Sequence, residues 1–165
     1  MTAEFPALFR STSGSVRNPQ PYVPATTGAL AVTAADVTLT RQADGTFAGR
    51  VPVTVRNDGD VAHRELWTEV AVPAGLDGWP AVEPSDVCVG AGRLPVPPGG
   101  GGVGCTLSGG QLAEGEERSF EWILTAPAGT AAGPLGTGTT MVGFVPDVPQ
   151  SDDANVDTFT ITVAG

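Results

Sequence analysis

Cys88 and Cys105 are the first residues of this chain that could do chemistry. They flank a segment rich in glycine and proline, and their spacing lacks the Cys-x-x-Cys pattern of zinc and redox sites. One interpretation is a disulfide, which would stabilise the fold by about 3 kcal/mol by restricting the unfolded chain. The alternative is two separate buried thiols. A disulfide would indicate a secreted protein, because disulfides persist in oxidising compartments.

The single histidine offers little for catalysis. His63 follows a predicted turn and precedes Arg64. No nucleophile and general base can be assembled around it, and a disulfide would remove both thiols as nucleophiles. We interpret His63 as a surface residue. We predict that the protein is not an enzyme and has no cofactor, with calcium as the one exception considered next.

Acidic side chains gather in three predicted loops, residues 57–62, 108–117 and 146–155. If the strands follow a sandwich order, these loops lie at one end of the domain and could hold Ca²⁺, which takes about six to eight oxygen ligands. The calcium hypothesis names four ligands: Asp58, Asp60, Asp152 and Asp153. The alternative is that these residues only form turns and solubilise the surface, because no loop has a regular D-x-D-x-D spacing.

Three tryptophans raise the question of carbohydrate binding, since aromatic rings can stack on the faces of sugars. Trp122 alternates with apolar residues and is predicted to lie in the core. Trp67 lies on the polar side of its segment, and Trp79 lies in a loop before Pro80. Trp67 and Trp79 would form a glycan contact if both are exposed. The commoner role of such residues is to shield a sheet face or a domain end.

The segments that must position these residues alternate between apolar and polar side chains. Such period-two segments predict strands, and the clearest span residues 47–55, 66–72, 120–126, 138–145 and 156–163. With 23 Gly and 15 Pro in 165 residues, the chain suits short strands joined by turns. We predict an all-β fold, an antiparallel β-sandwich of seven or eight strands, with a barrel as the alternative. A phase change near Ala35 and Asp36 predicts a bulge that divides the first strand between two sheets.

Residues 1–27 differ from the rest. Prolines and Ser/Thr clusters predict an extended N-terminal tail or linker, and residues 28–165 are predicted to form the domain. The tail is nevertheless more apolar than a solvated linker needs. Added as a strand to the sheet edge of a neighbouring copy, it would build head-to-tail filaments; a disordered linker and a segment folded back on its own domain are the alternatives. The candidate partner-binding residues are Phe5, Leu8, Phe9, Val16, Tyr22 and Val23.

The charge pattern excludes some partners. The net charge is −10, and all eight basic residues are arginine. An acidic surface repels phosphate backbones, so no nucleic-acid partner is expected. Without lysine, the chain cannot form an isopeptide bond or a lysine-based pilin linkage. No apolar run approaches the roughly 20 residues of a membrane span. Because residues 1–10 lack the features of a secretory signal, we interpret the chain as one from which a signal has been removed.

Four short motifs follow one another along the chain. They are V-T-V-R-N-D-G-D at 53–60, V-P-A-G-L at 72–76, C-T-L at 105–107 with Q-L-A-E-G-E at 111–116, and D-D-A-N at 152–155. Over residues 30–163 this series resembles the conserved-repeat Ig-like β-sandwich modules of bacterial and archaeal cell-surface proteins. The resemblance implies an immunoglobulin-like fold in an extracellular spacer, repeat or assembly module without catalysis. The segment between Asp77 and Gly104 is longer and richer in glycine than in those modules.

These observations lead to one main hypothesis and two alternatives. The main hypothesis is a non-enzymatic structural or adhesive module of a secreted bacterial surface protein, which binds protein and self-assembles by N-terminal strand addition. One alternative is a carbohydrate-binding accessory module. The other is a decoration domain of a phage virion, since phages also display Ig-like modules.

Overall fold

The computed structural model describes residues 30–59, 62, 65–84, 87–90, 93–144 and 155–165. Several residues singled out in the sequence lie outside this part of the chain. They are the six candidate partner-binding residues of the tail (Phe5, Leu8, Phe9, Val16, Tyr22 and Val23), His63, and the candidate calcium ligands Asp60, Asp152 and Asp153.

The described part of the chain is all-β, with ten strands. The strands are β1 (Leu30–Ala34), β2 (Val37–Arg41), β3 (Phe47–Asn57), β4 (Leu66–Val72), β5 (Ala81–Glu83), β6 (Cys88–Gly90), β7 (Gly101–Leu107), β8 (Glu117–Ala126), β9 (Gly133–Phe144) and β10 (Val156–Val163). In this part, no helix is long and apolar enough to cross a membrane.

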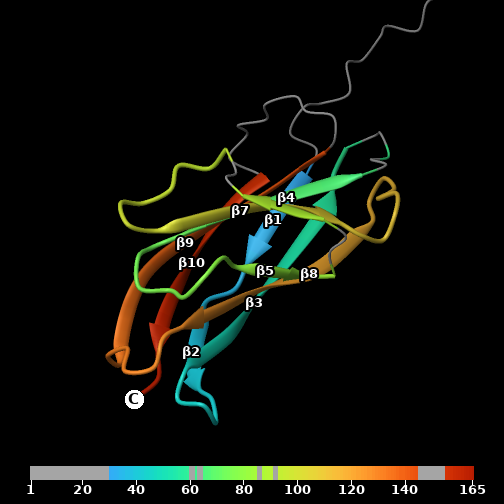
Figure 1. Cartoon of the computed structure of the whole chain (residues 1–165). Coiled ribbons are helices and arrows are strands. Elements are labelled where there is room, and N and C mark those ends of the chain that lie inside the picture. Colours follow the sequence, from blue (N-terminus) through green and yellow to red (C-terminus); the bar gives the residue numbers. More distant parts are fainter. Residues whose placement is uncertain (1–29, 60–61, 63–64, 85–86, 91–92, 145–154) are drawn as a thin grey trace, which may run out of the picture.

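The strands form one hydrogen-bonded order, β5-β8-β3-β2-β10-β9-β4-β7-β6, with β1 paired to β3. The order folds over so that two halves face each other (Figure 1). We call them the β3 half, with β1, β3, β5 and β8, and the β4 half, with β4, β6, β7, β9 and β10. β2 links them, because it pairs with β3 at one end and with β10 at the other.

The break predicted near Ala35 and Asp36 is confirmed. β1 ends at Ala34 and β2 begins at Val37, so one extended segment serves both halves. Two aspartates satisfy backbone donors where the halves meet. Asp157 Oδ2 accepts a hydrogen bond from the Ala34 N–H at 2.8 Å, and Asp36 Oδ1 accepts one from the Thr160 N–H at 2.7 Å. The Thr160 bond holds the pKa of Asp36 below its usual value.

The predicted strand number and the antiparallel arrangement need correction. Ten strands replace seven or eight because the break divides the first strand and because β5 and β6 are only three residues long. The pairing of β2 with β10 is parallel. A strand that crosses from one half to the other arrives beside β10 running in the same direction, and a period-two pattern carries no information on strand direction.

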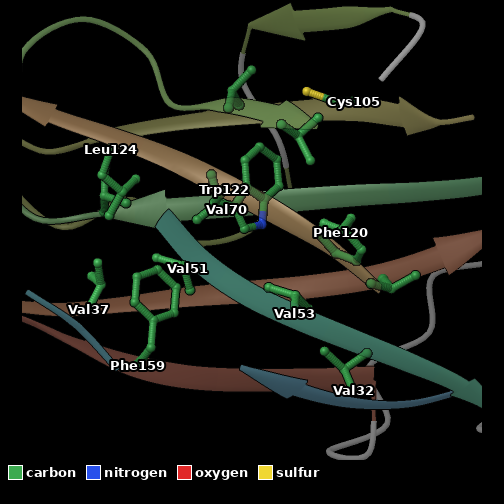
Figure 2. Close-up of a cluster of buried hydrophobic side chains, with 14 of the residues drawn as sticks. Val32, Val37, Val51, Val53, Val70, Cys105, Phe120, Trp122, Leu124 and Phe159 are labelled. Carbon is green, nitrogen blue, oxygen red and sulfur yellow. The ribbon is translucent and has the colours of Figure 1, made fainter. Parts of the chain in front are cut away.

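The core lies between the two halves and is built from the alternate residues predicted to point inward. Trp122 of β8 lies at its centre among side chains that include Val70 and Phe159 from the β4 half (Figure 2). The indole Nε1 of Trp122 donates to Thr140 Oγ1 of β9 at 2.9 Å, and that hydroxyl donates to the backbone oxygen of Glu69 at 3.0 Å. This chain of hydrogen bonds satisfies buried polar groups and joins the two halves.

Candidate binding surfaces

The turn that follows β3 brings two of the four motifs together. Asn57 is fully buried, and its Nδ2 donates to the backbone oxygen of Leu112 at 3.2 Å while its Oδ1 accepts the Gly59 N–H at 3.0 Å. The Asn57 N–H donates to the Glu116 oxygen, and the Gly115 N–H donates to the Asn57 oxygen. Leu112 is buried beneath this turn. Asparagine is suited to this position because one side chain supplies both a donor and an acceptor.

The calcium hypothesis stays a prediction. Of its four ligands only Asp58 belongs to the described residues, and Asp58 Oδ1 forms an ion pair with Arg56 Nε at 2.8 Å. Within the described ranges, no three His, Cys, Asp or Glu residues group as a metal site would. To bind calcium, Asp58 would have to break the ion pair with Arg56, or use its second carboxylate oxygen as the ligand.

Cys88 and Cys105 form a disulfide, which confirms the first of the two interpretations for these residues. They are direct cross-strand partners in β6 and β7, with Cα atoms 4.0 Å apart. Cys105 is completely buried in the core, whereas Cys88 is exposed. The disulfide therefore fastens β6, the last strand of the β4 half, to the core.

The outer side of β4 and β7 carries a buried carboxylate, and we call it the shielded face. Glu69 is 1% exposed, although it points away from the core. Its Oε1 accepts the indole N–H of Trp67 at 2.8 Å, and its Oε2 accepts the backbone N–H groups of Arg93 and Leu94, the latter at 3.1 Å. Three donors thus replace the water that the carboxylate loses.

Glycines make room for the groups that cover the shielded face. A Cβ on Gly104 would collide with the ring of Trp67, and a Cβ on Gly102 would lie 2.8 Å from Val96 Cγ2. Both glycines belong to β7, beside Glu69 and Ala71 of β4. The segment from Arg93 to Gly100 therefore lies over β7, where two strand positions without side chains let it pack closely.

An apolar strip borders the shielded face. Val87, Val89 and Val96 are 58%, 48% and 44% exposed, and we call these three residues the edge strip. Val89 pairs with Gly104, the residue on which Trp67 packs. Val89 belongs to β6 and Val87 directly precedes that strand, while Val96 lies against Gly102 of β7. β6 ends the strand order, and among the described strands it pairs with β7 alone. An edge strand has hydrogen-bonding groups that another extended chain can use.

The outer side of β3, β8 and β5 is built differently, and we call it the open face. Arg50 of β3 donates from Nη1 to Glu83 Oε2 of β5 and to Glu121 Oε2 of β8, both at 2.8 Å. These three side chains are between 40% and 59% exposed. Trp79, just before β5, is 68% exposed. The two carboxylates raise the pKa of Arg50, chiefly through the hydrogen bond to Glu83.

The tryptophan predictions have different outcomes. Trp122 lies in the core as predicted, and Trp67 lies on the outer side of its strand. Trp79 precedes β5, which pairs with β8, whereas Trp67 belongs to β4, which pairs with β7 and β9. The structure thus places the two candidate glycan residues on different halves rather than on one platform. Glu69 and Arg50 were not singled out from the sequence. Both occupy alternating polar positions of strands, and nothing in the sequence indicates the hydrogen bonds and ion pairs that they form.

Comparisons with known proteins do not assign a family. No protein-family model and no curated protein match the chain. Solved structures similar in part include AvmM, which catalyzes macrocyclization in alchivemycin A biosynthesis (14% identity, TM-score 0.46), over 84% of this chain and 90% of that chain. Another is a collagen-binding domain from a Staphylococcus aureus adhesin (10% identity, TM-score 0.36), over 83% of this chain and 97% of that chain. In a Vibrio harveyi GH20 exo-β-N-acetylglucosaminidase (12%, 0.36), the likeness covers 82% of this chain and 18% of that one. With these low TM-scores, no function is transferred.

Proposed function

We propose that the chain is a non-enzymatic structural or adhesive module of a secreted surface protein, with an Ig-like β-sandwich that binds a protein partner along the edge strip. The observation that carries the proposal is where exposed apolar surface gathers. The large hydrophobic residues that are exposed in the described part number four, and three of them are Val87, Val89 and Val96. Exposed apolar residues beside a strand edge that no other described strand covers are typical of protein interaction sites.

An extended segment is the partner that fits this edge. Main-chain groups would extend the ladder beyond β6, and alternate side chains would pack on Val87 and Val89. The tail of a second copy is our candidate for that segment, which would give the head-to-tail filaments predicted above. Residues 1–29 contain one acidic residue and two arginines, so they have a net charge of +1 while the remainder has −11. Opposite charge favours their association.

The experiment compares four chains by light scattering and electron microscopy. The intact chain should form filaments or oligomers, deletion of residues 1–27 should abolish them, and Val89→Lys should weaken them, since a charge at an edge opposes strand pairing. Thr137→Lys is the matched control, because Thr137 is an exposed strand residue of β9 away from the strip. A deletion variant with unchanged mass would contradict self-assembly. If the Val89→Lys protein assembles or binds as the intact chain does, the proposal that a partner binds along the edge strip is wrong.

A second candidate function is glycan binding, favoured by a different observation. Trp79 exposes 68% of its surface on the open face, away from the edge strip. An exposed indole on the same face as carboxylate and guanidinium groups has the chemistry to hold a sugar chain, because it adds an apolar surface to hydrogen-bonding groups.

A further inference from the structure

We propose that the open face binds a polysaccharide of hexopyranose rings that carry free amino groups. Trp79 stacks on one ring, and Glu83 and Glu121 accept hydrogen bonds from the amines and hydroxyls of the next rings. The inference rests on the glycan-binding candidate above and is independent of the edge strip, so each can fail without the other.

Trp79 is held out to solvent by a firmly anchored segment. The Asp77 N–H donates to the Thr125 oxygen at 2.8 Å, and Thr125 Oγ1 donates to the Asp77 oxygen at 2.9 Å. On the other side of the indole, Pro80 and Val82 are buried while Ala81 is exposed. Anchors on both sides fix the backbone at Trp79, so little conformational entropy is lost when a ligand binds there.

Three strands place the charged groups in line with this tryptophan. Exposed and buried residues alternate from Trp79 to Glu83, so Trp79, Ala81 and Glu83 lie on the same side of the segment. Ala81 pairs with Ile123, which pairs with Arg50, and these residues form one row across β5, β8 and β3. The next row holds Glu83 and Glu121. Four residue-to-residue steps of extended chain, of about 3.3 Å each, put Trp79 about 13 Å from Glu83, so the ligand must be an oligosaccharide.

The charge of the open face selects the kind of sugar. Two carboxylates surround one guanidinium, which leaves a local charge of −1 on a chain of net charge −10. Arg50 engages one oxygen of each glutamate, and no hydrogen bond joins the Oε1 atoms to another residue in the described ranges. These oxygens can accept from ammonium or hydroxyl groups. Polyanionic glycans would be repelled, whereas an amino sugar is attracted.

The test titrates the full chain with a β-linked glucosamine hexamer and follows binding by calorimetry. We expect saturable binding that weakens with salt. Trp79→Ala should weaken binding by about tenfold, because it removes the indole face on which the sugar ring and its ammonium group stack. Glu83→Gln with Glu121→Gln should weaken it several-fold and flatten the salt dependence. Thr137→Ala on β9 is the matched control, because Thr137 is an exposed strand residue of the other half, and this variant should bind the hexamer like the intact chain.

Three outcomes would overturn the inference. Trp79→Ala that binds the hexamer as tightly as the intact chain removes the site, as does an intact chain that shows no binding at millimolar sugar. Equal affinity for the fully N-acetylated hexamer removes the role of the amines and carboxylates. Because Trp79 is exposed, Trp79→Ala should unfold at the same temperature as the intact chain, and that measurement separates lost binding from lost folding. Failure here leaves the light-scattering result for the edge strip unaffected.

Discussion

The shielded face, with Trp67, and the open face, with Trp79, are both outer sides of the folded sheet that carry glutamates, yet their carboxylates have opposite surroundings. On the shielded face the carboxylate of Glu69 is 1% exposed and accepts three hydrogen bonds. On the open face Glu83 and Glu121 keep contact with water and share one arginine. The first arrangement satisfies the carboxylate within the chain, and the second leaves acceptors available to a ligand.

The difference teaches what a covering segment does to an acidic residue. A carboxylate loses its hydration when a loop covers it, and the cost is large unless the loop itself supplies donors. Arg93 and Leu94 supply these donors from their backbone N–H groups, so the hydrogen bonds do not depend on the conformation of the two side chains. No such segment is seen over the open face among the described residues. We therefore expect mutations on the shielded face to affect stability and mutations on the open face to affect binding.

The largest expected effect is that of Glu69→Ala. Truncation leaves the N–H groups of Trp67, Arg93 and Leu94 without their acceptor, and the loss should be about 3 kcal/mol in the free energy of unfolding. Glu83→Ala on the open face is the control, and its change should be too small to resolve. Urea denaturation of both variants measures this. Equal losses in the two would contradict the contrast between the faces.

Removal of the disulfide should have an effect of similar size and should show whether the shielded face depends on it. Cys88 and Cys105 are 17 residues apart, and the segment between them contains Arg93 and Leu94. Replacing both cysteines by alanine should cost about 3 kcal/mol through the greater entropy of the unfolded chain. If the disulfide also holds the segment in place, adding Glu69→Ala to this variant should cost less than it does in the intact chain. Strict additivity would show that the two hydrogen bonds from Arg93 and Leu94 hold the segment without help from the disulfide.

Gly104→Ala tests the packing of Trp67 on β7. The new Cβ would collide with the indole ring, so the ring must move away from Glu69, at a cost of about 2 kcal/mol. Gly143→Ala is the matched control, because Gly143 lies beside Trp67 on β9 and has no atom within 4 Å of the added Cβ. Thermal unfolding should separate the two variants. A stable Gly104→Ala protein would mean that the ring of Trp67 has room to turn.

The strands were largely predictable because their burial repeats locally. Val51, Val53 and Val55 in β3, and Phe159, Ile161 and Val163 in β10, are buried as the alternation indicated. The break near Ala35 and Asp36 also left a local sign, the change of phase. Short strands left none: β5 has one buried residue, Val82, between exposed neighbours, and three residues do not establish a period.

The binding surfaces were less predictable because distant residues create them. Glu69 is buried by Arg93 and Leu94, which lie 24 and 25 positions further along the chain. Its place in an alternating strand indicated only an outward-pointing side chain. Trp79 was a candidate from its position before Pro80, but its neighbours on the open face depend on the pairing of β5 with β8. A sequence pattern of period two does not contain such pairings between distant strands.

Asp36 combines features of the two faces, because it is an exposed carboxylate, like Glu83, that accepts a backbone hydrogen bond, like Glu69. Its donor is the Thr160 N–H. That bond lowers the pKa of Asp36 in the folded state. A group with a depressed folded pKa stabilises the protein fully above its unfolded value of about 4, and the stabilisation is lost as the pH falls through the folded value. Asp36→Asn keeps an acceptor but cannot titrate. Its stability should therefore fall less between about pH 6 and about pH 3 than that of the intact chain, as urea denaturation at the two pH values would measure. Because Asp36 is exposed, we expect this to be the smallest of the four effects. Identical losses of stability in both proteins would mean that the hydrogen bond from Thr160 gives the Asp36 carboxylate no more than hydration does.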